Sequence, residues 1–220
     1  MARIARVVAE HYPHHITQRG NRRQDTFFCD NDYQYYTQLM AEWCDQCGVA
    51  IWAYCLMPNH VHLIAVPESA DGLRRAIGEA HRRYTRSINF REKWRGHLWQ
   101  GRFASFVMDE QYLLAATRYV EHNPVKAGLV SVPEDYPWSS AKAHIQGKDD
   151  DLVKVTPLLE MVDDWQQFLS NDVSDKECAL LQRHERTGRP LGSERFIAQL
   201  ENTLSRILTP QKGGRPRKAR

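Results

Sequence analysis

Residues 51–66 read IWAYCLMPNHVHLIAV, two β-rich runs separated by the turn pair Pro58-Asn59. Apolar and β-branched runs on both sides of such a pair are typical of a β-hairpin. Alternate residues of a strand face the same side, so the second strand should project His60 and His62 together and Val61 to the opposite face. This hairpin is the centre of the predicted fold.

The segments before the hairpin add a strand and a helix. Residues 14–29 indicate a strand that runs into a turn containing Gly20 and three arginines. Apolar residues from Tyr35 to Trp43 then recur at helical spacing until Gly48 ends the pattern. A helix is therefore expected between the first strand and the hairpin.

The segments after the hairpin repeat this alternation. Residues 70–91 predict a basic amphipathic helix, residues 101–108 a further strand, and Asp109 the cap of a helix that must end before Pro124. The order β-α-β-β-α-β predicts an α+β fold of the ferredoxin-like or split βαβ type, one antiparallel sheet with helices on one face. Two small unrelated domains are the alternative, but no linker interrupts residues 14–123.

The formal net charge of +3 over 220 residues is the sum of unequal parts. Residues 73–102 hold nine Lys or Arg against two Glu, and the last nine residues hold five Lys or Arg and no acid. Residues 149–185 hold ten acids against three bases, and no motif is recognisable in them. The two basic segments predict contacts with the phosphates of a nucleic acid.

The expected nucleic-acid contacts come from the first turn, the basic helix with its following loop, and the tail. In the tail, Gly214-Arg215-Pro216 resembles the core of an AT-hook, an Arg-Pro unit that fits a narrow minor groove. Trp94 and Trp99 interleave with the basic residues and could stack on unpaired bases. The arginines expected to bind are Arg19, Arg22, Arg23, Arg82, Arg83, Arg86, Arg102 and Arg215.

Composition also limits where the protein works. The longest apolar run, residues 49–57, is far shorter than the ~20 residues that span a bilayer, and the first residues lack a signal-peptide core. Five cysteines without a regular framework suit a reducing compartment, so a cytoplasmic protein is expected. Cys44 and Cys47 could be half of a zinc site, but no second Cys-x-x-Cys completes it, and plain helix cysteines are expected.

Two pairs of polar residues carry possible chemistry. His60 and His62, on one side of a strand beside a turn, make half of a divalent-metal site. Tyr119 and Asn123 lie four residues apart, so they share one face of the helix that begins at Asp109. A phenol beside an amide oxygen suggests a nucleophile with a metal-ligand neighbour. The structural alternatives are a chance His-x-His and a partly buried tyrosine near a helix end.

Four ordered motifs stand out: MPNHVHLI (57–64) with the upstream HITQRGNRRQ (15–24), GHLWQGRF (96–103), RYVEHNPVKAGLV (118–130) and YPWSSA (136–141). Together they resemble the single-tyrosine HUH transposases of bacterial insertion sequences, and in particular their single-copy relatives, the REP-associated tyrosine transposases. The resemblance covers about residues 10–145 and implies a transposase and nuclease domain of the HUH endonuclease fold there. Residues 146–209 are then expected to form an accessory helical region and residues 210–220 a basic disordered tail.

The resemblance also implies a site and an activity. In the family the two HUH histidines bind a divalent cation and the tyrosine attacks a phosphate of single-stranded DNA, which implies His60 and His62 as metal ligands and Tyr119 as the catalytic nucleophile. Asn123 is implied as the third ligand, in the slot where related transposases place a Gln, with His122 as a weaker candidate. The implied cofactor is Mg²⁺ or Mn²⁺, and zinc is not excluded by ligand type.

The implied enzyme is a metal-dependent endonuclease and strand transferase of DNA transposition and recombination. It cleaves near hairpins such as REP palindromes through a 5′-phosphotyrosine intermediate, as a monomer or a homodimer. A histidine-triad hydrolase would need a third histidine where Ile64 stands. A non-catalytic, sequence- or structure-specific DNA-binding regulator would need neither Tyr119 nor the metal, and a metallophosphoesterase that uses water would tolerate loss of Tyr119. These last two alternatives stay open on the sequence.

Overall fold

The computed structural model describes residues 4–171 and 173–210, and in them four strands form one antiparallel sheet. The strands follow the spatial order β2-β3-β1-β4, so β3 lies between β1 and β2, and β1 lies between β3 and β4. This is the split βαβ arrangement, and the predicted α+β fold is confirmed. The strands are β1 (His14–Arg19), β2 (Val49–Met57), β3 (His60–Pro67) and β4 (Ala104–Val107).

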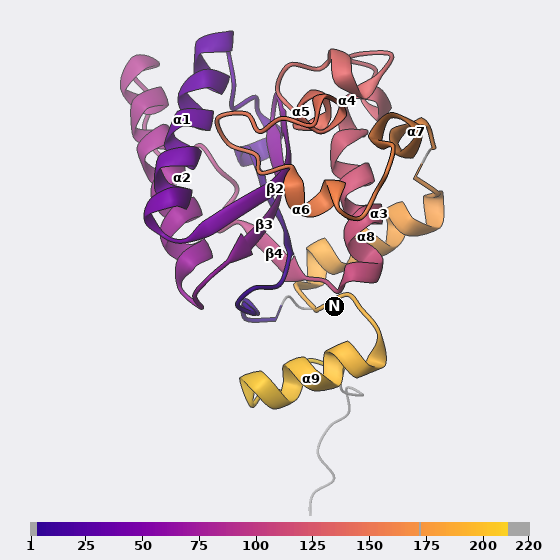
Figure 1. Cartoon of the computed structure of the whole chain (residues 1–220). Helices are drawn as coiled ribbons and strands as arrows, with labels where there is room; N and C mark the ends of the chain where they lie inside the picture. Colours follow the sequence, from indigo (N-terminus) through magenta and orange to yellow (C-terminus); the bar gives the residue numbers. More distant parts are fainter. Residues whose placement is uncertain (1–3, 172, 211–220) are drawn as a thin grey trace, which may run out of the picture.

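Two crossover helices, α1 (Asp30–Gln46) and α2 (Gly72–Arg91), cover one face of the sheet (Figure 1). Their buried stripes pack against side chains of β1 and β3 that point to this side, Ile16, Val61 and Leu63. The stripes include two aromatic residues that are fully buried, Tyr36 and Tyr84. Cys44 and Cys47 are buried in the same core. We call this side of the sheet the scaffold face.

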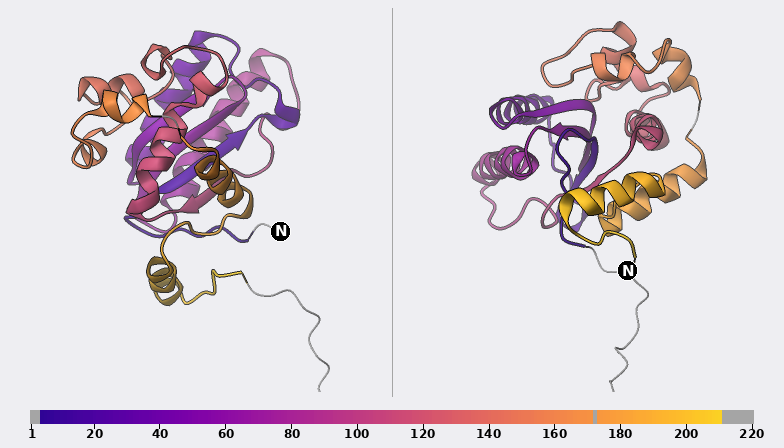
Figure 2. Two further views of the ribbon diagram at one scale, coloured as in Figure 1. Left: turned by 90° about the vertical axis from the view of Figure 1, so that its right-hand side faces the viewer. Right: turned by 60° about the horizontal axis from the view of Figure 1, so that its bottom comes forward.

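The opposite face is covered as well, by α3 (Glu110–Glu121) and by later helices (Figure 2, right). The prediction of helices on one face only is therefore correct for α1 and α2 but wrong for α3. Ala53, Ile64 and Phe106 point to this second side, and α3 buries them beneath its own apolar stripe. Residues 49–57 explain why the second face is covered: they form an uninterrupted apolar run, which is typical of a strand that is buried on both faces. We call this side the cleft face.

The region after α3 is helical, as expected, and continues the core of the cleft face. Leu158, Trp165 and Leu181 from this region join that core, so the division of the chain at residues 145 and 146 remains a prediction. None of the described helices is long and apolar enough to cross a bilayer. The elements are α4 (Asn123–Lys126), η2 (Pro133–Asp135), α5 (Ala141–Gln146), α6 (Thr156–Leu159), α7 (Trp165–Ser170), α8 (Asp175–Thr187) and α9 (Glu194–Leu204).

A buried polar network fixes the end of α3. Glu121 is fully buried, and its Oε1 accepts hydrogen bonds from Ser140 Oγ (2.5 Å) and His144 Nδ1 (2.7 Å). Its Oε2 accepts a third from Trp165 Nε1 (3.0 Å). Buried charges are tolerated when several donors satisfy them. The network ties α3 to α5 and α7 two residues away from Tyr119, so it holds the helix that carries the candidate nucleophile.

Candidate active site

A cleft of about 590 Å³ opens on the cleft face of the sheet. Its walls come from β1, from the loop before β4, from α3 and from α8, which are far apart in the sequence. His62 and Tyr119 both line it, together with the arginines Arg19, Arg23 and Arg102. The structure thus brings part of the predicted metal pair, the predicted nucleophile and three of the predicted DNA contacts into one cavity.

The histidines of β3 project together, as strand alternation predicts. The ring centroids of His60 and His62 are 5.0 Å apart. His60 Nδ1 donates a hydrogen bond to Asn59 Oδ1 (2.6 Å). The Nε2 atom of His60 is then the ring nitrogen with a free lone pair. His62 hydrogen-bonds through Nδ1 to His15 Nε2 (3.0 Å). Among the residues that the structure describes, none hydrogen-bonds to the Nε2 atom of either ring of the pair.

His15 is a site residue that the sequence did not single out. It lies on β1, pairs across the sheet with Ile64, and stacks on His62 with ring centroids 5.2 Å apart. Its ring also meets Tyr119 edge-on at 6.0 Å. Its Nδ1 atom is buried without a partner, so the hydrogen bond to His62 is the only one that this ring makes within the described chain. His15 therefore sets the orientation of His62.

Burial determines the protonation of the three rings. It lowers the pKa of His15 and of His60 to about 3, with the charge of Arg19 adding to the effect at His60. It lowers the pKa of His62 well below the usual value, and the neighbouring His60 and His15 act in the same direction. Neutral imidazole is the form that binds metals. The pair with two free Nε2 atoms therefore fits a divalent cation. Within residues 4–171 and 173–210, no group of three or more His, Cys, Asp or Glu is arranged so that it could hold a metal ion by itself.

Tyr119 faces the histidines from α3. Its ring meets His62 edge-on at 5.6 Å, and only 8% of the residue is exposed. Burial raises the pKa of its phenol, and the charge of Glu185 adds to this, while a hydrogen bond with Gln182 acts in the opposite direction. Tyr112, a second tyrosine of α3, is partly buried and packs against the core of the cleft face.

Asn123 and His122 lie beyond Tyr119 and outside the cleft lining. Asn123 stands at the start of α4 and its Nδ2 donates to the backbone carbonyl of Tyr119 (2.8 Å). Its assignment as a third ligand stays a prediction. His122 is buried and hydrogen-bonds through Nε2 to the carbonyl of Leu169 (2.6 Å), so it serves the packing of α7.

Helix α8 supplies a wall of the cleft that the sequence did not reveal. Gln182, Glu185 and Arg186 line the cavity from this helix, which lies in and beyond the acidic segment without a recognised motif. Burial raises the pKa of Glu185, whereas a hydrogen bond with Thr17 and the charge of Arg19 lower it. The start of α8 was readable from its capping box, Ser174 with Glu177, but its docking on β1 depends on tertiary packing.

The remaining predicted DNA contacts are distributed over other surfaces. Arg22 is exposed in the turn η1 (Asn21–Arg23), which depends on Gly20 because a Cβ there would lie 2.2 Å from the carbonyl oxygen of Gln24. Trp99 is buried in the core of the scaffold face, so the expectation that it stacks on bases is wrong. Arg82, Arg83 and Arg86 lie on α2, on the scaffold side. Arg215 and all of the tail except Pro210 fall outside the described residues.

Comparisons with known proteins agree with these observations. The family described as "Transposase IS200 like" matches residues 8–123, which contain the whole sheet, both histidines of β3 and Tyr119. A curated relative from Haemophilus influenzae, named as a REP-associated tyrosine transposase, is 33% identical over 112 residues, 44% of this chain and 64% of the relative. The chain thus spans somewhat less than two thirds of that relative's length.

A solved structure extends the likeness to the fold. The structure of a REP-associated tyrosine transposase bound to a REP hairpin is 21% identical, covers 80% of this chain and 94% of its own, and superposes with a TM-score of 0.60. At that identity the likeness concerns the fold, which includes helices beyond the family match. The resemblance in the sequence motifs is confirmed at the level of the family: the chain belongs to the IS200-like transposase family.

Proposed function

We propose that this protein nicks and joins single-stranded DNA, with Tyr119 as the nucleophile. The observation that carries the proposal is the placement of Tyr119 against His62, with ring centroids 5.6 Å apart, inside a cleft lined by four arginines. A phenol can attack phosphorus, neutral imidazoles can hold a cation, and fixed cations can bind phosphate oxygens, so the cleft contains groups suited to transfer of a phosphodiester. Membership of a transposase family supports the same reaction class.

His60 and His62 would hold a divalent cation through their free Nε2 atoms. The hydrogen bonds of the other ring nitrogens to Asn59 and His15 orient the two rings, as supporting residues do in metal sites. The cation, Mg²⁺ or Mn²⁺, supplies a Lewis acid that polarises a phosphoryl oxygen. Asn123 remains the proposed third ligand, and its side-chain oxygen would have to turn toward the pair.

The reaction is a transesterification that conserves the energy of the phosphodiester. Tyr119 Oη forms a bond to phosphorus, the bond to the 3′ oxygen breaks, and that oxygen takes up a proton as a free 3′-hydroxyl. The other strand end stays linked to Tyr119 as a 5′-phosphotyrosine, which a second 3′-hydroxyl can attack in the reverse step. Because burial raises the pKa of the Tyr119 phenol, its proton leaves only as the new bond forms.

The arginines of the cleft hold the strand in place. The cavity is lined on the side of β1 and β4 by Arg19, Arg23 and Arg102. Each guanidinium group can donate two parallel hydrogen bonds to the oxygens of one phosphate. The substrate that the names of the relatives support is DNA with a hairpin of the REP type. Action on chromosomal DNA would place the protein in the cytoplasm.

Trapping of a covalent adduct tests the proposal. Wild-type protein with Mg²⁺ or Mn²⁺ and a labelled hairpin-bearing single strand should give a protein–DNA adduct that survives denaturing electrophoresis. Tyr119→Phe should abolish both adduct and cleavage but bind the same strand with near wild-type affinity, because only the nucleophilic oxygen is lost. Tyr112→Phe, on the same helix and outside the cleft, is the matched control and should retain the adduct.

The other outcomes identify the alternatives. Full cleavage by Tyr119→Phe would mean that water is the nucleophile, as in a metallophosphoesterase. If the wild type binds the hairpin but does not cleave it with any of the metals tried, the protein is a DNA-binding regulator and not a nuclease.

A further inference from the structure

Exposed aromatic side chains gather at one place on the scaffold side of the molecule. Four lie around the start of α1 and the end of α2: Phe28, Tyr35, Phe90 and Trp94. Phe90 is 87% exposed, the most exposed large apolar side chain in the described chain. Phe28 and Trp94 meet edge-on with ring centroids 5.6 Å apart. We call these four residues the aromatic patch.

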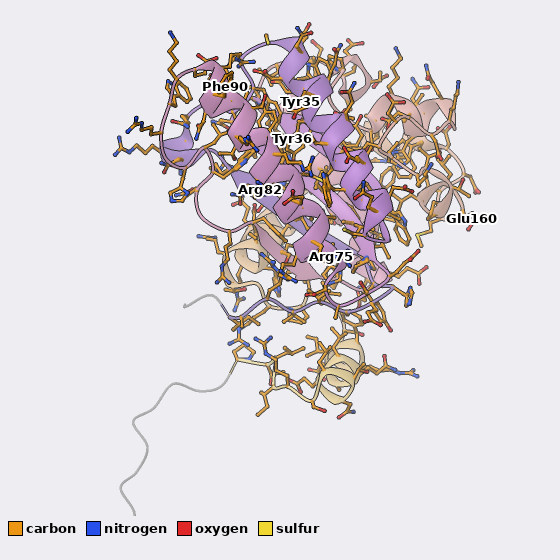
Figure 3. All side chains as sticks on the ribbon, turned by 90° about the vertical axis from the view of Figure 1, so that its left-hand side faces the viewer. Tyr35, Tyr36, Arg75, Arg82, Phe90 and Glu160 are labelled. Atoms are coloured by element: carbon orange, nitrogen blue, oxygen red, sulfur yellow. The ribbon has the colours of Figure 1, made fainter. Side chains whose placement is uncertain are left out.

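An open groove of about 510 Å³ joins this patch to the arginines of α2. Tyr35 and Phe90 line it together with Arg82, Arg83 and Arg86. Figure 3 shows Tyr35, Arg82 and Phe90 on the outward side of α1 and α2. The groove therefore offers flat rings and cations to one ligand.

The spacing along α2 gives the groove a regular order. Arg82, Arg86 and Phe90 are four residues apart, so they follow one side of the helix at steps of about 6 Å. Arg82 and Arg83 are fixed by Glu79, which accepts hydrogen bonds from both. Arg86 has no ion-pair partner among the described residues. Cations followed by an uncovered ring are the combination that binds single-stranded nucleic acid, phosphates on arginine and bases on the aromatic face.

We infer that this groove is a second DNA-binding site, which stacks an unpaired base on Phe90 and Tyr35 and binds the adjoining phosphates through Arg82 and Arg86. It is distinct from the cleft, because α2 packs on the scaffold face whereas His62 and Tyr119 lie on the other side of the sheet. Exposure of the apolar Phe90 ring to water is unfavourable, and base stacking would remove that ring from water.

A single loop connects the two sites. Residues 92–103 run from the aromatic patch, which includes Trp94, to the cleft, where Gln100 and Arg102 form part of the wall. Backbone hydrogen bonds pin this loop to the first turn, from Gln100 N to the carbonyl of Arg19 and from Asn21 N to that of Leu98. A single-stranded DNA whose cleaved phosphate lies in the cleft can thus follow the basic loop around the edge of the β-sheet to the groove.

Binding measurements in a cleavage-dead background test the inference. With Tyr119→Phe throughout, the affinity for a long fluorescein-labelled single-stranded oligonucleotide is measured by anisotropy at fixed salt. Phe90→Ala should weaken binding about tenfold, and Phe90→Trp should retain it, because any aromatic face can stack. Val132→Ala, also a truncation of an exposed apolar residue (41% exposed) but outside the groove, is the matched control. Unchanged affinity of Phe90→Ala would overturn the inference.

Photocrosslinking gives an independent readout. Oligonucleotides that carry 5-iododeoxyuridine should form adducts at Phe90 or Tyr35, mapped by mass spectrometry, in addition to any in the cleft. Adducts confined to the cleft would contradict a second site. A change of sedimentation by Phe90→Ala with unchanged DNA affinity would instead make the groove a protein interface. Since neither assay needs catalysis, failure of the phosphotyrosine mechanism would leave these results unaffected.

Discussion

The two faces of the sheet use the same strands for different purposes. On the scaffold face, Ile16 and Leu63 pack against the aromatic stripes of α1 and α2 in an apolar core. On the cleft face, their neighbours His15 and His62 occupy positions that would otherwise be apolar, and Tyr119 meets them from α3. Strand alternation thus lets one strand hold both a core and a reactive surface. The proposed chemistry lies where the core of the cleft face is left incomplete.

Hydrogen bonds hold the polar groups of the cleft face in place. His15 orients His62, Asn59 orients His60, and the Glu121 network fixes the helix of Tyr119. A site of this kind needs supporting contacts because a small misplacement of a catalytic group costs much of the rate. The scaffold face supplies the rigid support, so substitutions on the two faces should have separable effects.

The largest effect is expected from His62→Ala, on the cleft face. Loss of this proposed metal ligand should lower the rate of strand cleavage about a thousandfold, because a bound metal would contribute several kcal/mol to stabilisation of the transition state. Urea unfolding should show that the protein remains folded. His60→Ala should stay inactive in excess Mn²⁺ as well. Unchanged cleavage by either variant would remove its ligand assignment.

The next effect is on stability and comes from the adjacent residue, Leu63→Ala, on the scaffold face. Leu63 is fully buried, so its truncation should lower the free energy of unfolding by about 3 kcal/mol through lost burial and a cavity. Cleavage per folded molecule should change less than twofold. Leu129→Ala, at an exposed leucine, is the control and should leave stability nearly unchanged. A large loss of rate in folded Leu63→Ala would show that the two faces are not separable.

The smallest effect is expected at the wall contributed by α8. Glu185 carries a carboxylate into a cleft built for phosphate, so Glu185→Gln should tighten single-stranded DNA binding about two- to fivefold, in keeping with the ~0.5–1 kcal/mol of a partly exposed charge interaction. Glu160→Gln makes the same charge change at an exposed site away from the cleft and should have little effect (Figure 3). Weaker binding of Glu185→Gln would show that the carboxylate supports the strand.

The sequence was informative where local pattern determines structure. The hairpin, the crossover helices and the common orientation of His60 and His62 follow from periodicity of two and of 3.6 residues, and the structure has them as predicted. The pairing of Tyr119 with the histidines followed from the family motifs. In the first three cases residues near one another in sequence carry the signal, whereas the pairing of Tyr119 with the histidines needed the resemblance to a family.

The sequence was not informative where distant segments meet. His15 joins the site only because β1 pairs with β3 in a register that places it beside His62, and nothing in the run His14-His15 specifies that register. Glu185 enters the cleft only through the docking of α8. Trp99 lies in a basic loop, where a tryptophan suggests stacking on bases, yet in the folded protein its side chain is buried in the core of the scaffold face. These outcomes depend on tertiary packing between distant segments, and no periodic pattern in a single sequence predicts such packing.

The central claim is that Tyr119 forms a covalent bond with DNA, and mass spectrometry of the trapped adduct tests it most directly. After digestion of protein and DNA, the account predicts that one peptide gains a nucleotide through a phosphate on Tyr119, with the free 3′-hydroxyl on the released strand. Cleavage without any adduct, or an adduct at Tyr112 instead, would contradict it.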